Sequence, residues 1–227
     1  MKTKIGSNKK EWLIPAGLIL LSVVPIAAGA ARLTELSTGA EITPDNVRFF
    51  ASPLPVILHI LSVSIYSLLG AFQFAHGFRL RRHKFHRISG WMLVPAGLIA
   101  ALSGLWMTLS YPWPEGDGVF LYWQRLVFGS AMLVSILLAV VAIRQRDYVR
   151  HGAWMLRAYA IGLGAGTQVL THLPWFIFFG TPSEFPRALL MGAGWVINLV
   201  VAEWIISKRM NSKKKKRSHA VVATEPM

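Results

Sequence analysis

The segment from Leu54 to Gly90 joins an apolar stretch of helix length to the basic run FRLRRHKFHRISG. A bilayer is crossed by about 20 consecutive apolar residues in a helix. The five lysines and arginines of the run cannot lie in hydrocarbon, and basic loops stay on the cytoplasmic side of a membrane. One end of this helix is therefore predicted at the cytoplasmic surface, and His59 near its opposite, outer end.

Further apolar segments of similar length follow and precede this one. The chain is 54% hydrophobic and only 15% charged, whereas about a quarter of the residues of a soluble protein are charged. The sequence predicts an all-α, polytopic membrane helix bundle with six transmembrane helices and both termini in the cytoplasm. The predicted spans cover residues 12–31, 54–78, 88–111, 119–143, 152–179 and 188–206. The small-residue stretch near Ala30 is also compatible with a cleaved signal peptide.

The net charge of +14 comes from basic clusters at the ends of the apolar segments. Such clusters set the topology and contact anionic lipid headgroups, so no nucleic-acid partner is expected. Residues 1–11 form a basic cytoplasmic N-terminus, and residues 208–227 form a basic tail that is predicted to be disordered. The single transmembrane domain between them covers residues 12–207.

Ionisable residues within the predicted spans are candidates for a functional site, because burying them in a membrane costs free energy. His59 is predicted about 8 Å below the outer surface and His172 about 11 Å below it, at 1.5 Å per helical residue. Arg125 falls at a similar level. Two histidines on facing helices, with an arginine for a propionate group, suit a bis-histidine haem b site. The alternatives are hydrogen-bonded packing residues, a polar path, or a different metal.

Gln73 lies on the same helical stripe as His59 and belongs to the predicted cofactor-binding residues. A second cluster of histidines is predicted at the cytoplasmic level, where it suits an inner metal, haem or quinone site, or simply solvated side chains. It contains His76, His83, His86 and His151. The sequence has no cysteine, which excludes disulfides and thiolate ligands.

Arg157 and Glu203 are predicted to form a structural ion pair near the cytoplasmic ends of their helices, with a proton relay as the alternative. Asn198 is predicted to donate a hydrogen bond between helices.

The run RRHKFHRISG, the pattern RHGAWMLRAYA from Arg150 to Ala160 and the stretch NLVVAEWII resemble the bacterial multi-pass membrane family catalogued as domain of unknown function 2306. The resemblance covers about residues 54–207 and implies a bundle in the bacterial inner membrane. Its histidine layout is similar to that of di-haem cytochrome b561 proteins. Trp91 departs from the family pattern, and His172 does not belong to it. The matched positions are His59, Gln73, His83, His86, Arg87, Gly90, His151, Trp154, Arg157, Tyr159 and Glu203.

The function expected from these residues is transmembrane electron transfer through haem b, from quinol or another redox partner. A non-redox transporter of a small molecule or of protons is the first alternative. The second is an accessory or assembly subunit of a membrane complex, in which the polar stripes only join helices.

Overall fold

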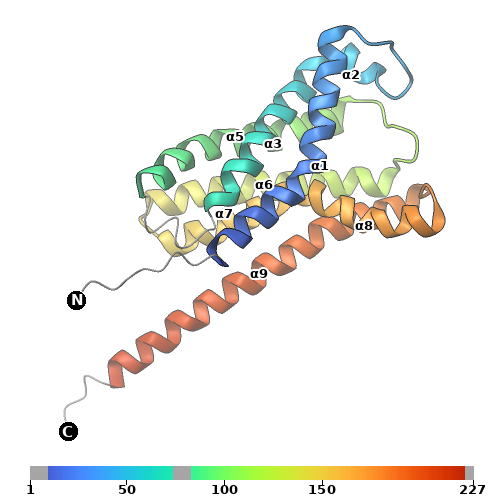
Figure 1. The fold of residues 1–227 in the computed structure, drawn as a ribbon. Helices are drawn as coiled ribbons and strands as arrows, with labels where there is room; N and C mark the ends of the chain where they lie inside the picture. The colour runs from blue at the N-terminus through green and yellow to red at the C-terminus, as the bar shows by residue number, and fades with distance from the viewer. Residues whose placement is uncertain (1–9, 74–82, 223–227) are drawn as a thin grey trace.

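The computed structural model describes residues 10–73 and 83–222, and all the regular secondary structure in these ranges is helical (Figure 1). The predicted all-α fold is confirmed in this respect. The helices are α1 (Lys10–Thr38), α2 (Val47–Ala51), α3 (Pro53–Gln73), α5 (His83–Ser110), α6 (Val119–Arg144), α7 (Tyr148–Gly162), α8 (Gly164–Phe179) and α9 (Glu184–Val222).

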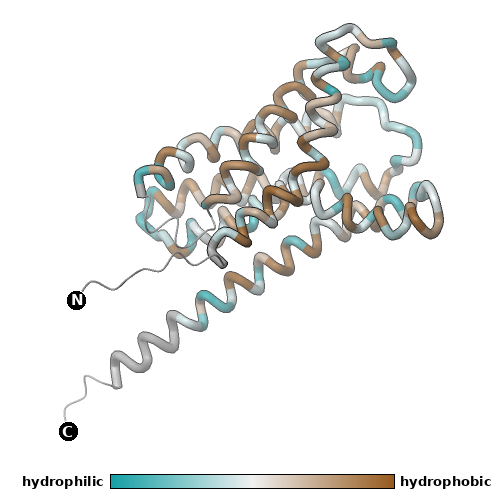
Figure 2. The backbone as a smooth tube through the Cα atoms, viewed as in Figure 1, coloured by the Kyte–Doolittle hydropathy of each residue, from teal (hydrophilic) through white to brown (hydrophobic). Residues whose placement is uncertain are grey.

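Five of the described helices are long and apolar enough to cross a membrane, and they include α1, α3, α5, α6 and most of α9. Figure 2 shows the hydrophobic residues distributed along these helices. Many of their large apolar side chains are exposed on the outside of the bundle, as Trp91 and Leu20 are. In a membrane these side chains face lipid, so their exposure does not cost the free energy that it would cost in water.

The helices pack mainly as sequential pairs: α3 lies along α5, α6 along α7, and α8 along α9. The first helix, α1, contacts both α3 and α8, and α7 also contacts α3 and α9. The N-terminus of α7 is capped by Asp147, whose carboxylate accepts a hydrogen bond from the amide of Arg150 at 2.9 Å. Gly180, with φ of 76°, ends α8.

The centre of the bundle contains two tyrosines that pack against glycines. The ring of Tyr66 occupies the space that a Cβ would take at Gly97 or Gly162. A Cβ built there would lie 2.7 Å from the nearest ring atom at Gly97 and 3.0 Å from it at Gly162. Tyr159 lies beside it, and its hydroxyl donates to the carbonyl oxygen of Ser67 at 2.8 Å. These close approaches join α3, α5 and α7 into one core.

The predicted span over residues 152–179 is two helices in the structure, because the helix is interrupted at Leu163 between α7 and α8. Asn198 of α9 bridges the interruption. Its Nδ2 donates to the carbonyl oxygen of Ala160 at 3.0 Å, and its Oδ1 accepts from the hydroxyl of Thr167 at 2.8 Å. The prediction that Asn198 donates a hydrogen bond between helices is confirmed. One amide thus partners polar groups on both sides of the break.

Other boundaries also differ from the expected ones. α1 continues to Thr38 and α9 to Val222, and the short helix α2 forms within the segment between α1 and α3. The extension of α1 is supported by the ion pair of Arg32 with Glu35, one turn apart.

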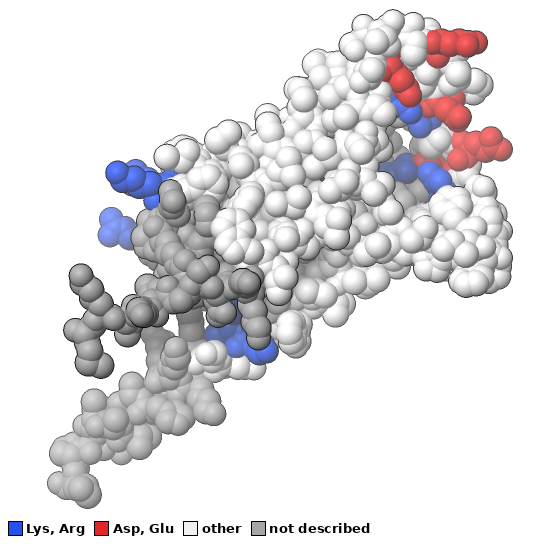
Figure 3. Space-filling view, viewed as in Figure 1, with Lys and Arg blue, Asp and Glu red and all other residues white. Residues whose placement is uncertain are grey.

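Charged side chains are divided between the two ends of the bundle (Figure 3). The end that carries α2 and the loops before α6 and α9 holds Glu35, Glu41, Asp45, Glu115, Asp117 and Glu184. We call it the acidic end. The opposite end, which we call the basic end, includes Lys84, Arg87, Arg144, Arg146 and Arg150.

Candidate ligand cavity near the acidic end

A cavity of about 470 Å³ lies between the helices in the half of the bundle toward the acidic end. Its walls come from α1, α2, α3, α5, α6, α8, the loop between α5 and α6, the α7–α8 junction and Trp195 of α9. The interior is mainly apolar, and Arg48, Trp113 and Asp117 line it at the acidic end. A largely apolar cavity of this size with a few convergent polar groups has the form of a small-molecule site.

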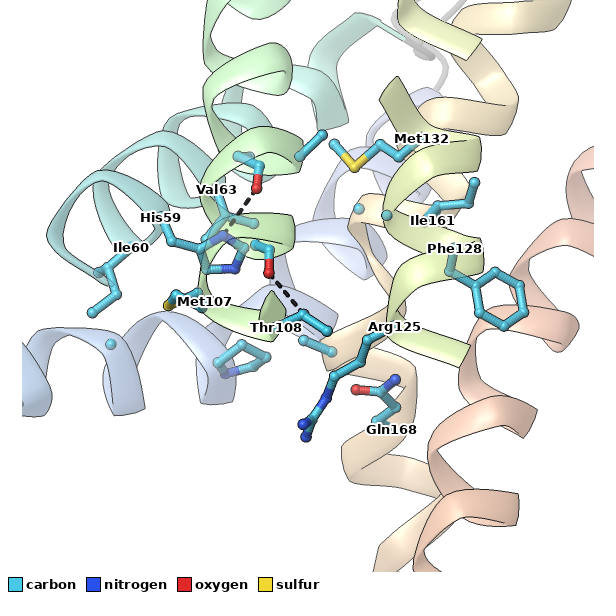
Figure 4. A pocket seen from close by; sticks show the side chains of 18 of the residues that line it. His59, Ile60, Val63, Met107, Thr108, Arg125, Phe128, Met132, Ile161 and Gln168 are labelled. Atoms are coloured by element: carbon cyan, nitrogen blue, oxygen red, sulfur yellow. Dashed lines mark hydrogen bonds between the residues drawn. The ribbon is translucent and has the colours of Figure 1, made fainter. Parts of the chain in front are cut away.

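His59 of α3 is the histidine that lines this cavity. Its Nδ1 lies 3.0 Å from the carbonyl oxygen of Ala100 and 3.2 Å from the hydroxyl oxygen of Ser103. A carbonyl oxygen only accepts hydrogen bonds, so this contact assigns the ring proton to Nδ1. Nε2 then keeps its lone pair, and Figure 4 shows this nitrogen on the side of the ring away from the hydrogen-bonded Nδ1. A histidine held in this way is prepared to bind a metal through Nε2.

His172 of α8 is not among the residues that line the cavity. Its Nδ1 lies 2.7 Å from the carbonyl oxygen of Gln168 on its own helix, and its ring lies 6.2 Å from that of Phe176. The structure therefore places His59 in the cavity wall and His172 outside it. The pairing of the two histidines across one iron stays a prediction.

Arg125 lines the cavity and is part of an ion-pair cluster at its acidic end. Its Nη1 donates to Oδ2 of Asp117 at 2.5 Å, and Nε of Arg187 donates to Oδ1 of the same carboxylate at 2.9 Å. The side chain of Asp117 is only 2% exposed. The two arginines thus share the charge of one buried carboxylate.

The α7–α8 break forms part of the cavity wall, because Gly162, Leu163 and Gly166 line it. At Gly166 an added Cβ would lie 2.2 Å from the carbonyl oxygen of Leu21 in α1. Pro25 follows Leu21 by four residues and has no N–H, so this carbonyl lacks the donor that a regular α-helix would supply. Gly166 therefore permits a close approach of two backbones beside the cavity.

Two glutamines occupy different parts of the molecule. Gln168 lines the cavity, and its Nε2 donates to the carbonyl oxygen of Met191 at 3.0 Å. Gln73 bonds to the hydroxyl of Ser89 and lies 3.4 Å from the carbonyl oxygen of His86, so it joins α3 to α5 and does not line the cavity.

Two members of the predicted histidine cluster, His86 and His151, are described with their side chains, and both lie at the basic end. His76 and the side chain of His83 are outside the described residues, and His86 lies in the first turn of α5. Nδ1 of His151 lies 2.9 Å from the carbonyl oxygen of Ala139. Within the described ranges, no group of three or more histidine, aspartate and glutamate side chains is close enough to hold a metal ion.

The structure brings Arg157 and Glu203 together in a two-pronged ion pair between α7 and α9. Nε and Nη2 of the arginine donate to the two carboxylate oxygens at 2.5 Å and 2.9 Å. The guanidinium also lies 4.5 Å from the ring centre of Trp154.

Arg48 is a cavity residue that sequence analysis missed, as is Asp117. Arg48 lies in α2, in the polar segment between the first two predicted spans, where an arginine is expected to be solvated. The sequence signal that could have found it is the short apolar stretch FFA after it, which lies in α2 and whose Phe49 packs against Tyr111.

The comparisons with known proteins give one match. A family model described as "Predicted membrane protein (DUF2306)" matches residues 56–206, which is more than half of the chain and includes His59, the cavity walls from α3 to α9 and the Arg157–Glu203 pair. No curated protein and no solved structure matches. The chain therefore belongs to the DUF2306 family of predicted membrane proteins.

Proposed function

We propose that the chain crosses the bacterial inner membrane six times, with both termini in the cytoplasm. α7 and α8 have 15 and 16 residues, and each is about 23 Å long, which is short of a hydrocarbon core of about 30 Å. Joined at Leu163, they are long enough for the sixth crossing. The basic end then faces the cytoplasm, as the distribution of lysine and arginine favours.

We propose further that the cavity binds haem b and that the protein transfers electrons across part of the membrane. The observation that carries this proposal is the state of His59, whose Nδ1 is held by the carbonyl of Ala100 and whose Nε2 is left free in an apolar cavity. A haem iron bound there would supply one-electron chemistry. The electron donor in this proposal is a quinol or another redox partner.

The protein's own residues have distinct roles in this proposal. Ser103 and the Ala100 carbonyl orient the imidazole of His59, and the cavity walls around it are mainly apolar. The sequence predicts His172 as a second residue that would hold the haem iron, but the structure places it outside the cavity wall. Met107 and Met132 line the cavity, and their thioethers could hold the iron instead.

The test is the reduced-minus-oxidised visible spectrum of the protein purified from haem-replete cells. We expect bands of a b-type haem in the wild type, their loss in His59→Ala, and their retention in His151→Ala, which removes a histidine at the basic end. A colourless wild-type protein would contradict the haem proposal. Loss of the bands in His151→Ala alone would move the site to the basic end.

A second function is favoured by a different observation, the helix break at Leu163 beside the cavity. Discontinuous helices form the substrate sites of many transporters. In a transporter of protons, purified protein in liposomes would dissipate an imposed pH gradient, as a pH-sensitive dye reports. The electron-transfer function requires no such flux.

A further inference from the structure

The cavity has a charged end and an apolar interior, and the two parts select different portions of a ligand. Arg48, Asp117 and Arg125 line its acidic end, whereas Ile60 and Ile161 are among the apolar residues that line the rest. A molecule that fills such a cavity has an apolar body and one polar end.

Three of the four arginines near this end already have a carboxylate partner, and Arg32 pairs with Glu35. Arg125 and Arg187 both donate to Asp117, and this carboxylate is almost completely buried. A propionate or other anion would compete with Asp117 for Arg125, which makes Arg125 a weaker anion ligand than the sequence suggests.

Arg48 is different, because it lines the cavity and forms no ion pair with any described carboxylate. Its guanidinium lies 4.6 Å from the ring centre of Phe49. More distant charges have opposing effects on its pKa. The carboxylates of Asp117 and Asp45 raise the pKa, and the guanidinium groups of Arg32 and Arg125 lower it. Burial lowers the pKa of Arg48, but a guanidinium remains charged in a protein.

The position of Arg48 is fixed by contacts of α2 with its surroundings. The ring of Phe49 packs edge-on against Tyr111, with ring centres 5.6 Å apart, and the hydroxyl of Tyr111 donates to the carbonyl oxygen of Ser52 at 2.5 Å. Burial raises the pKa of Tyr111, so its phenol stays a donor. The guanidinium is therefore held at the cavity and not at the end of a free loop.

We propose that Arg48 binds the carboxylate of an amphiphilic ligand whose apolar body lies in the cavity beside His59. This inference rests on the proposed function only in that the cavity binds a ligand. The planar guanidinium matches a carboxylate through two parallel hydrogen bonds. Haem b and a long-chain fatty acid both have this chemistry, an apolar body with a carboxylate at its edge or end.

The first experiment uses a brominated long-chain fatty acid and the matched brominated alcohol, at a pH where the acid is ionised. Bromine quenches tryptophan fluorescence, and Trp113 and Trp195 line the cavity. We expect the wild type to bind the acid more tightly than the alcohol. Arg48→Gln should weaken binding of the acid about tenfold, the value of one charge-assisted hydrogen bond, and leave the alcohol unchanged.

Arg32→Gln is the matched control. Arg32 lies over the same Phe49 ring, at 4.4 Å, but it pairs with Glu35 and does not line the cavity. It should leave acid binding unchanged, and unfolding temperatures would show that both variants are folded. Three results would overturn the proposal. The two substitutions could have equal effects, the wild type could bind the acid and the alcohol equally tightly, or it could bind neither ligand.

A second experiment separates this proposal from the haem proposal. Haem and its dimethyl ester, in which both propionates are neutral, are titrated into the wild type and Arg48→Gln. If haem binds, Arg48→Gln should weaken haem about tenfold and leave the ester unchanged. Equal haem affinities in the two proteins would contradict the role of Arg48. If the wild type binds no haem, the haem proposal fails, and the fatty-acid experiment alone decides the role of Arg48.

Discussion

At the scale of residues, Asp117 is the carboxylate that holds the acidic end of the cavity together. Its side chain is buried and accepts from Arg125 and Arg187, which come from different helices, α6 and α9. We expect Asp117→Asn to destabilise the protein by about 1–3 kcal/mol, because two partly buried arginines lose their counter-charge. The unfolding temperature of the variant in detergent, compared with that of the wild type, measures this loss of stability.

Glu115→Gln is the control for that measurement, since Glu115 lies in the same turn and is exposed. Its unfolding temperature should equal that of the wild type. If Asp117→Asn unfolds at the wild-type temperature too, the cluster does not stabilise this end of the bundle.

The candidate site could be predicted from the sequence only in part. His59 was identifiable because an ionisable residue deep in an apolar segment needs a protein environment. Arg48 was not, because whether a loop arginine reaches a cavity depends on how α2 packs against α3 and Tyr111. Whether His172 faces His59 depends on how α1 packs against α3 and α8. The depth of each histidine in the membrane, which the sequence predicts, does not show how these helices are arranged.

At the scale of elements, the break between α7 and α8 depends on Asn198. We expect Asn198→Leu to cost about 1–2 kcal/mol, because the carbonyl of Ala160 and the hydroxyl of Thr167 lose their shared partner. Hydrogen exchange of the amides at residues 163–168 should become faster. Ser110→Ala, which removes a hydroxyl bonded only within α5, should leave that exchange unchanged. Unchanged exchange in Asn198→Leu would show that the break is stable without this bridge.

The helices themselves were largely predictable, because apolar length and basic flanks determine where a segment can cross a membrane. The break at Leu163 was not. Glycines such as Gly162 and Gly164 occur within continuous transmembrane helices as well, and the partner that satisfies the interrupted backbone comes from α9, far along the chain.

At the scale of the whole molecule, the charge division between the two ends sets the expected orientation. The sequence has no cysteine, so single cysteines can report the topology without a background signal. We expect Glu115→Cys and Thr181→Cys to react in intact cells with a maleimide that does not cross the inner membrane. Gln145→Cys should react only after the membrane is permeabilised.

The cysteine at position 181 is decisive for the α7–α8 pair, because it follows α8 directly. Protection of that cysteine in intact cells, with labelling at position 115, would mean that α7 and α8 do not complete a crossing. Labelling at position 145 in intact cells would contradict the orientation itself.

The most direct measurement is a haem titration of His59→Gly, with and without added imidazole. If Nε2 of His59 is the ligand atom in the cavity, the wild type should bind haem with the absorption spectrum of a histidine-ligated haem, and His59→Gly should lose it. Free imidazole should restore the spectrum, because it fits the space that the side chain leaves. Haem binding by His59→Gly without imidazole, with the wild-type spectrum and affinity, would contradict the assignment of His59.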